Sequence, residues 1–374
     1  MTASLNERLR TVKWGNYKLG DIFEVVSYKK RFDANKVCVY EDGRYPYIVR
    51  MGTNNGQKGY INEDTKYLND GNTISFGQDT ATVFYQEKPY FTGDKIKILK
   101  PKFPEFCKSN AQFFIATMNL AFRSFSWGSS SFNTEIIKDV KLTLPSTPDG
   151  EIDYGFMDSF VAELEAERVA ELSAYLAVSG LDNHKLSKEE EEALVAYSTY
   201  EWGTFNLKSL YGKSTRGKRL KSEDRIPGSL PFVTAGEAEE GVSAFIGNDV
   251  EVFEKNTTTI DMFGSAKYRN YSYGGDDHVA IVHTETVPMK AAIFVTSACH
   301  KAAHTGKFDY GHNFYAKDAD ALDIKLPVKD GQPDYQAMEL LISAVQKLVI
   351  KDVVRYTDQK IAGTKELINH KEPN

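Results

Sequence analysis

The sequence has 374 residues, enough for two or three domains, and its 41% hydrophobic and 26% charged residues are typical of chains with packed cores. It contains no apolar run of membrane-spanning length, and its first ten residues do not resemble a signal peptide. Three cysteines (Cys38, Cys107 and Cys299) are few and far apart, which predicts reduced thiols in a cytoplasmic protein and argues against a disulfide framework.

The net charge of −6 is unevenly distributed along the chain. Residues 151–200 hold 12 acidic and 3 basic residues, whereas the rest of the chain holds 43 basic and 40 acidic residues. The location of charge matters more for partner binding than the total, so the acidic total does not exclude a nucleic-acid partner.

The first body of the chain begins at Trp14-Gly15 and is rich in strand-forming residues. Between residues 66 and 101, β-branched and aromatic residues alternate with Asn, Asp, Gly and Pro, which predicts several short strands. Residues 111–125 have the pattern of a helix. The mixture of strands and helix indicates an α/β body with a mixed or antiparallel sheet.

A long amphipathic helix is predicted over residues 154–179. Its apolar residues recur every three or four positions, and Gly180 follows it, where a left-handed residue usually ends a helix. At 1.5 Å per residue it would be roughly 39 Å long. A second helix with the same spacing is predicted over residues 335–356. Each helix has one apolar stripe, so burial of each stripe by the other would give a two-helix coiled coil.

Between the long helix and the second body, Ser187 and Glu190 fit a capping box at the start of a short helix. The second body then begins at Trp202-Gly203 and again alternates strand-like and helix-like segments.

The two bodies share the sequences at which they begin and end. The motifs of the first body recur in the second at offsets of 188, 182 and 181 residues: Trp14-Gly15 at Trp202-Gly203, Leu144-Pro145 at Leu326-Pro327, and Asp149-Gly150 at Asp330-Gly331. The changing offset indicates a duplication whose interiors have different lengths. We therefore expect an α/β protein with two repeated domains, 1–150 and 201–330, joined by two long antiparallel helices in 151–200 and 331–374.

Sequence motifs for catalysis are missing or weak. The chain has no Asn-Pro-Pro-Tyr-like tetrapeptide for a flipped adenine, no glycine-rich cofactor loop and no P-loop. His300 and His304 lie one helical turn apart, but Lys301 stands where a metalloprotease has glutamate. Asp334 with Asp358 and Lys360 resembles a nuclease signature, but the intervening sequence is helical. No catalytic residue, metal ligand or cofactor is predicted for this chain.

Basic and polar tracts remain, and each could be a solvated loop or a DNA contact. Lys, Arg, Asn, Gln, Ser and aromatic residues supply phosphate and base-edge contacts, and their recurrence in both bodies favours DNA. The candidates in the first body are Lys29, Lys30, Arg31, Arg50, Asn54, Asn55, Gln57, Lys58, Arg123, Ser129, Ser130 and Asn133. Those in the second are Lys213, Arg216, Lys218, Arg219, Lys221, Lys267, Arg269, Asn270, Tyr271, Tyr273, His300, Lys301 and His304. Base readout is predicted for residues 126–133 and 267–273.

This architecture resembles the specificity subunits of type I restriction–modification systems and the closely related type IIB subunits. The resemblance covers nearly the whole chain and rests on the Trp14-Gly15 and Lys18–Phe23 beginning, the second beginning at Trp202-Gly203, the two Leu-Pro ends and the helix at 163–176. Residues 206–211 depart from the Leu-Gly-Asp-Ile-Phe pattern of the first beginning.

The resemblance implies a subunit without enzymatic activity, in which two target-recognition domains each read half of an asymmetric, bipartite duplex DNA site. The helices would set the spacing of the halves and dock two modification subunits, which methylate adenine with S-adenosylmethionine, and a restriction subunit can join. Two alternatives stay open: a stand-alone site-specific nuclease or methyltransferase, and a two-headed protein-interaction adaptor.

Overall fold

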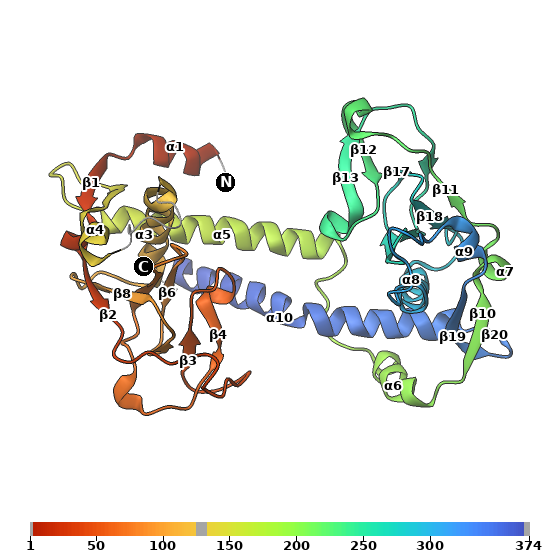
Figure 1. Cartoon of the computed structure of the whole chain (residues 1–374), viewed down its shortest axis with the longest axis horizontal. Helices are drawn as coiled ribbons and strands as arrows, with labels where there is room; N and C mark the ends of the chain where they lie inside the picture. The colour runs from red at the N-terminus through yellow and green to blue at the C-terminus, as the bar shows by residue number, and fades with distance from the viewer. Residues whose placement is uncertain (1–2, 125–132, 370–374) are drawn as a thin grey trace. The chain divides into compact units, whose positions relative to one another are not determined.

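The structure is a computed structural model that describes residues 3–124 and 133–369 (Figure 1). The chain divides into two compact units, residues 1–172 with 360–374, and residues 173–359. No described helix is long and apolar enough to cross a bilayer.

The first unit contains three small sheets. Its strands are β1 (Trp14–Lys18), β2 (Phe23–Ser27), β3 (Pro46–Ile48), β4 (Gln57–Tyr60), β5 (Thr73–Gly77), β6 (Val83–Gln86), β7 (Phe91–Thr92), β8 (Ile96–Pro101) and β9 (Lys141–Pro145). The strand orders are β1-β9, β2-β8-β5-β6 and β4-β3-β7; among the strand pairs of the described residues, β3–β7 is parallel and the others are antiparallel. Its helices are α1 (Ala3–Thr11), α2 (Leu19–Ile22), α3 (Lys108–Ala121), α4 (Thr134–Asp139) and most of α5 (Tyr154–Val178).

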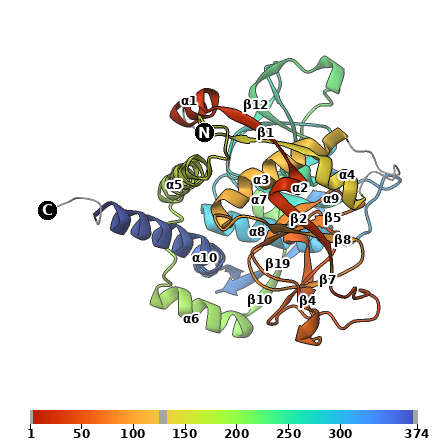
Figure 2. The same cartoon turned by 90° about the vertical axis from the view of Figure 1, so that its left-hand side faces the viewer.

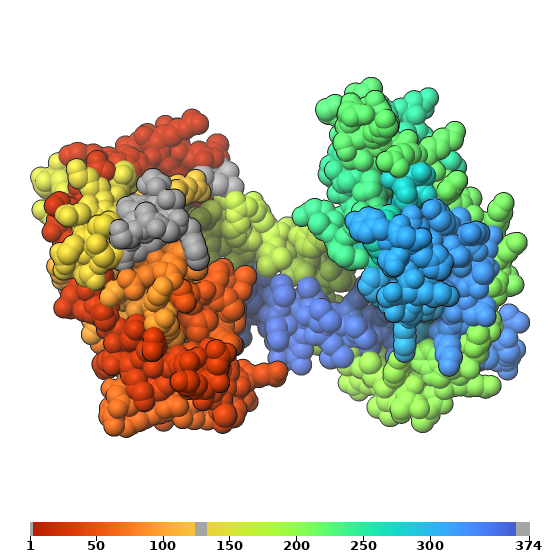
Figure 3. Space-filling model, in the orientation of Figure 1, coloured from red at the N-terminus to blue at the C-terminus, as the bar shows by residue number. Residues whose placement is uncertain are grey.

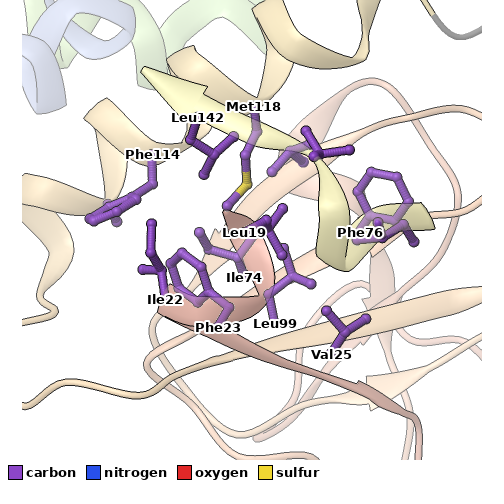
Figure 4. Close-up of a cluster of buried hydrophobic side chains, with 14 of the residues drawn as sticks. Leu19, Ile22, Phe23, Val25, Ile74, Phe76, Leu99, Phe114, Met118 and Leu142 are labelled. Carbon is purple, nitrogen blue, oxygen red and sulfur yellow. The ribbon is translucent and has the colours of Figure 1, made fainter. Parts of the chain in front are cut away.

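The core of the first unit lies between the four-stranded sheet and α3 (Figure 4). Phe114 of α3 meets Phe23 of β2 edge to face, with 5.3 Å between ring centroids. Met118 lies one turn further along α3 and is fully buried. α3 also packs against β6 and β9, and α2 lies against α4 (Figure 2). This packing gives the loops between the strands a rigid base.

The second unit has the same plan with two additional short strands. Its strands are β10 (Trp202–Asn206), β11 (Thr215–Arg216), β12 (Pro227–Val233), β13 (Val242–Ile246), β14 (Val252–Phe253), β15 (Thr257–Asp261), β16 (Ala266–Arg269), β17 (Tyr273–Gly275), β18 (Val279–Val282), β19 (Asp323–Lys329) and β20 (Gln332–Pro333). Its helices are α6 (Lys188–Ala196), α7 (Leu207–Tyr211), α8 (Met289–Ala303), α9 (Ala316–Asp320) and much of α10 (Tyr335–Asn369).

The strand orders of the second unit match those of the first. They are β10-β19-β20, β11-β18-β15-β16 and β13-β12-β17-β14, and the β12–β17 pair is parallel like the β3–β7 pair. In the same chain order, β14 and β20 are the additions. The two units therefore share a topology and not only short motifs.

The beginning and end motifs of each unit pair with one another. Trp14 lies opposite Pro145 in the β1–β9 ladder, and Trp202 lies opposite Pro327 in the β10–β19 ladder. The glycine after each tryptophan leaves room for an aromatic ring two residues on, since a Cβ on Gly15 would lie 2.6 Å from Tyr17 Oη. These motifs join the two ends of each unit.

The departure at residues 206–211 does not change the fold there. Leu207 begins α7 as Leu19 begins α2, and both side chains are fully buried. The amide of Leu19 donates to the Val140 carbonyl (2.8 Å), and that of Leu207 donates to the Leu322 carbonyl (3.0 Å). Leu207 therefore occupies the place of Leu19.

The long helices form close to where the sequence predicts them. α5 ends one residue before its predicted end, whereas α10 continues 13 residues beyond residue 356. The expectation that the whole α10 stripe is buried is wrong. Met338 and Leu341 are buried, but five apolar side chains further along are 36–75% exposed: Val345, Leu348, Val349, Val353 and Tyr356.

The predicted capping box at the start of α6 is confirmed. The Ser187 hydroxyl accepts from the Glu190 amide, and the Glu190 carboxylate accepts from the Ser187 amide (2.7 Å). The same carboxylate accepts from Lys347 Nζ of α10 at 2.8 Å. Burial raises the pKa of Glu190, but hydrogen bonds from Lys347, the Ser187 amide and Ser343 together lower it from 4.5 to about 2. This carboxylate therefore fastens α6 to α10.

Glu190→Gln should lower the free energy of unfolding by about 3 kcal/mol at pH 7, since the depressed pKa of Glu190 stabilises the folded state above pH 4.5. That contribution is lost as the pH falls from 4.5 toward 2, so the variant and the parent should converge in acid. Thermal unfolding between pH 7 and pH 3 measures both effects. Glu192→Gln, an exposed position on the same helix, is the control; a constant gap between Glu190→Gln and the parent across this range would contradict the assignment.

Candidate nucleic-acid interface

Two predicted arginines of the first unit lie on one open groove. Arg31 and Arg50 line it together with backbone and side chains of β3 and of the turn before β8, and its volume is about 560 Å³. Arg31 Nη1 lies 3.2 Å from Asp94, Arg50 is paired with Asp79, and Lys95 Nζ lies 2.9 Å from Asp79. A phosphate could replace these half-buried carboxylates, because ion pairs near the surface contribute little to stability.

Lys29 and Lys30 precede Arg31 on the same exposed edge. Lys30 Nζ lies over the rings of Phe32 and Tyr67, 4.8 and 4.5 Å from their centroids. Lys29 Nζ is 4.0 Å from Asp70. Both lysines are exposed, as phosphate contacts require, and of the two only Lys30 lies beside aromatic rings of the described residues.

The predicted residues at 54–58 form a turn and the start of a strand. Asn54 and Asn55 have left-handed backbones, and their side-chain amides donate to the carbonyls of Gln57 (2.8 Å) and Tyr85 (3.0 Å). Gln57 and Lys58 begin β4, and Lys58 is exposed. The turn is thus held in a defined shape at the surface.

The predicted readout loop at 126–133 lies mostly outside the described residues, Ser129 and Ser130 included. Arg123 is exposed at the end of the helical segment after α3. Asn133 is the N-cap of α4, where its side chain accepts from the Ile136 amide at 2.9 Å. Asn133 therefore has a structural role in the first unit.

The basic tract of the second unit is an exposed loop fixed at two points. Gly217 passes directly against Gly275, since a Cβ on Gly217 would lie 1.6 Å from the Gly275 carbonyl oxygen. The Leu220 carbonyl accepts from Arg225 Nε at 3.4 Å and from Nη2 at 3.3 Å. The five predicted cations around these anchors are all exposed: Lys213, Arg216, Lys218, Arg219 and Lys221.

The prediction that residues 267–273 form a readout surface is wrong for two of its members. Arg269 and Tyr273 are 1% and 0% exposed, so neither side chain can reach a duplex. Arg269 donates to Thr259 and to the Glu240 carbonyl, and also to the Tyr271 hydroxyl (3.0 Å). A buried guanidinium needs such partners to offset its desolvation.

The other predicted residues on this face are more accessible. Lys267 is partly buried, with Nζ 3.3 Å from Glu237, and Asn270 is exposed. His300 Nδ1 accepts from the Ala266 amide (3.1 Å), and its ring stacks on His304 with 4.7 Å between centroids. Lys301 and His304 are exposed. His300 thus lies at the start of β16, with His304 stacked against it.

A buried polar framework common to both units was not visible in the sequence. Tyr90 and Tyr273 each bond a threonine hydroxyl of the central strand, Thr73 at 3.2 Å and Thr257 at 2.9 Å. Burial raises the pKa of both tyrosines. Left-handed Asn72 and Asn256 likewise accept from Tyr85 (3.0 Å) and Tyr268 (2.8 Å). Alignment of the two repeats, strand by strand, is the signal that identifies these pairs.

Comparison with known proteins agrees with this architecture. Residues 11–174 match the family of type I restriction modification DNA specificity domains. The chain is 27% identical over 348 residues to the specificity subunit S.BcgI of a type II restriction enzyme from Heyndrickxia coagulans, covering 91% of this chain and 96% of that subunit. It is 24% identical over 268 residues to a putative type I specificity subunit from Mycoplasma pneumoniae, covering 69% and 70%.

Among solved structures, the chain resembles the S subunit of a type I restriction–modification system from M. genitalium. The TM-score is 0.61 at 14% identity, with 96% of this chain and 95% of that chain covered, so this likeness concerns the fold. The chain is therefore similar in sequence to specificity subunits of restriction–modification systems over most of its length, and similar in fold to one of their solved structures.

Proposed function

We propose that this chain is a non-catalytic subunit that recognises a bipartite, asymmetric duplex DNA site, one half with each unit. The observation that carries the proposal is the shared topology of the units, with the same buried framework and different exposed side chains. Such a pair would present two readers built on one frame. The proposed target-recognition domains are residues 1–150 and 201–330, and the proposed spacers are 151–200 and 331–374.

The proposed DNA surfaces are the groove with Arg31 and Arg50 in the first unit and the loop with Arg216, Lys218 and Arg219 in the second. Guanidinium and ammonium groups in exposed loops fix a protein on phosphates, whereas neighbouring polar side chains meet base edges. Lys267, Asn270, Lys301 and His304 form a further candidate surface of the second unit. Arg269 and Tyr273 are left out because they are buried.

The helices would join the readers and bind the partners. We propose that α5 and α10 form an antiparallel coiled coil; Glu165 of α5 and Lys360 of α10 form an ion pair at 2.6 Å. The exposed apolar side chains of α10 stand at residues 345, 348, 349, 353 and 356, which is a helical spacing, and part of the surface of α10 is visible in Figure 3. Such a stripe suits docking of a partner helix. The proposed partners are two adenine-N6 methyltransferase subunits, which would carry S-adenosylmethionine, and in some assemblies a restriction subunit.

The direct test mixes the purified chain with its methyltransferase partner. The partner is obtained from a cytoplasmic extract of the source organism or by co-expression with the chain. Adenine methylation at a bipartite site should require both proteins and S-adenosylmethionine. Methylation or Mg²⁺-dependent cleavage by the chain alone would favour the stand-alone enzyme instead. Duplex binding that does not weaken with salt would favour the adaptor.

Arg219→Ala should weaken binding to every duplex by a similar factor and reduce the slope of log affinity against log salt by about 1, because one phosphate contact is lost. Arg216→Ala should do the same. Anisotropy titrations at several salt concentrations measure the slope. Lys188→Ala, an exposed lysine on α6, is the matched control; an unchanged slope in both arginine variants would remove the loop from the interface.

A further inference from the structure

Each unit carries an unusual turn at the same place in its fold. Between β3 and β4, Asn54, Asn55 and Gly56 are three consecutive left-handed residues, with φ of 48°, 53° and 72°. Between β12 and β13, Glu239, Glu240 and Gly241 have φ of 47°, 54° and 81°. Glutamate rarely adopts this conformation, so its occurrence twice in succession shows that the surroundings hold the backbone there.

Equivalent hydrogen bonds close the two turns. The Val49 amide donates to the Gly56 carbonyl at 2.8 Å, and the Thr234 amide donates to the Gly241 carbonyl at 2.9 Å. These bonds join the end of the first strand of each hairpin to the start of the second. The turns are therefore structural counterparts, although their sequences share only the final glycine.

A buried side-chain donor supports the middle residue of each turn. Gln86, 4% exposed at the end of β6, donates through Nε2 to the Asn55 carbonyl (3.2 Å) and to Ser75 Oγ (3.0 Å). Arg269, at the end of β16, donates through Nη2 to the Glu240 carbonyl (2.8 Å) and through Nε to Thr259 Oγ1 (2.9 Å). Ser75 and Thr259 occupy the same place on the central strand. Gln86 and Arg269 thus have the same role with different chemistry.

The exposed side chains on this fixed backbone differ completely between the units. Asn54 and Asn55 are exposed in one, and Glu239 and Glu240 in the other. Basic residues of the same unit lie close in the chain or are bonded to the hairpin. Arg50 precedes the first turn, and Arg225 links the basic loop at Leu220 to Ser243, two residues after the second turn.

Two carboxylates beside a basic loop favour cytosine over adenine in the major groove, because the acceptor N7 beside the adenine amine repels a carboxylate. Phosphates repel them, but the exocyclic amine of cytosine in the major groove donates to a carboxylate. The side-chain amides of Asn54 and Asn55 each donate one hydrogen to a backbone carbonyl, which leaves the second amide hydrogen and Oδ1 to meet the N7 and N6 atoms of adenine. The same backbone would therefore read different bases.

We propose that these two turns are corresponding base-reading elements. Asn54 and Asn55 read adenine in one half-site, and Glu239 and Glu240 read cytosine in the other. Gln86 and Arg269 are the positioning residues of the two turns. The proposal rests on the DNA-recognition function proposed above. To that function it adds the identity of the residues that determine the base sequence of each half-site.

The test replaces Glu239 and Glu240 together by asparagine, in the chain assembled with its methyltransferase partner. Since asparagine adopts left-handed backbones more readily than glutamate, the variant should fold. Selection of bound duplexes from a pool with both half-sites randomised should show one position of one half-site changing from cytosine to adenine, by about tenfold in preference. The reciprocal Asn54→Glu with Asn55→Glu variant should change only the other half-site.

Two controls distinguish a loss of base reading from a general effect of lost negative charge and from a defect in folding. Glu191→Asn with Glu192→Asn, two exposed acids on α6, removes the same charge and should leave all base preferences unchanged. Arg269→Met should flatten the preference at the same position, whereas Arg269→Gln, which copies the other unit, should restore it. The half-site read by the first unit should stay constant in both Arg269 variants and so reports that the rest of the protein is intact.

The outcomes distinguish failure of the DNA-recognition function from failure of the base-reading role of the turns. If the parent assembly selects no bipartite sequence, the DNA-recognition function fails. If the parent selects a bipartite sequence but the turn variants select the same one, the function stands and the base-reading role of the turns is overturned. A change in both half-sites from a variant of one turn would also overturn it.

Discussion

Replacing Gly217 by alanine is expected to lower the free energy of unfolding of the second unit by about 3 kcal/mol or more. The new Cβ would lie 1.6 Å from the carbonyl oxygen of Gly275, and the opposing atoms are backbone that cannot rotate away. For a unit of this size the melting temperature should fall by roughly 6–12 °C. Thermal unfolding followed by circular dichroism measures the change.

Gly363→Ala is a control that should change stability in the opposite direction. A Cβ at this position of α10 meets no atom within 4 Å, and alanine favours helix over glycine by about 1 kcal/mol. This variant should be at least as stable as the parent. If the Gly217→Ala variant has the melting temperature and the duplex affinity of the parent, the basic loop does not depend on this contact.

The pairing of the beginning and end motifs shows what sequence can and cannot reveal. Trp14-Gly15 and Leu144-Pro145 could be identified because they recur around Trp202 and Leu326. That Trp14 lies opposite Pro145 is a long-range contact, which no local pattern of strand residues encodes. The repeat, the α/β class and both long helices were therefore predictable, whereas strand order was not.

Burial separates the candidate residues that sequence predicted well from those it did not. The loop with Lys218 and Arg219 is exposed because its charges are too dense to be buried. Arg269 lies in an equally polar stretch but is buried, because Thr259 and the Glu240 carbonyl lie within reach of its guanidinium. Those partners come from other strands, so the stretch around Arg269 alone could not reveal them.

The acidic turn was overlooked for a related reason. A search for DNA contacts by charge selects Lys and Arg and passes over Glu239 and Glu240. Their significance comes from the equivalence with Asn54 and Asn55, which requires the backbone angles and the buried donors of both units.

The largest expected effect on function comes from lengthening α5. Duplicating residues 166–169 adds about one helical turn, roughly 6 Å, which is close to two base pairs at about 3.4 Å each. Because four residues nearly match the period of 3.6, the apolar stripe of α5 keeps its direction. The Glu165–Lys360 ion pair lies before the insertion and should persist. We expect a folded subunit that selects the same half-sites with a spacer longer by one or two base pairs.

A two-residue insertion at the same position separates a spacing role from a purely structural one. It rotates the following part of the stripe by about 200°, so it should disrupt packing of α5 and lower stability rather than give a new spacer. Selection from duplex pools with randomised spacers, in the presence of the methyltransferase partner, reads out both variants. If the four-residue variant folds and retains the parental spacer, α5 does not set the distance between half-sites. In that case, the exposed apolar stripe of α10 would serve partner docking alone, and spacing would have to come from the recognition units themselves.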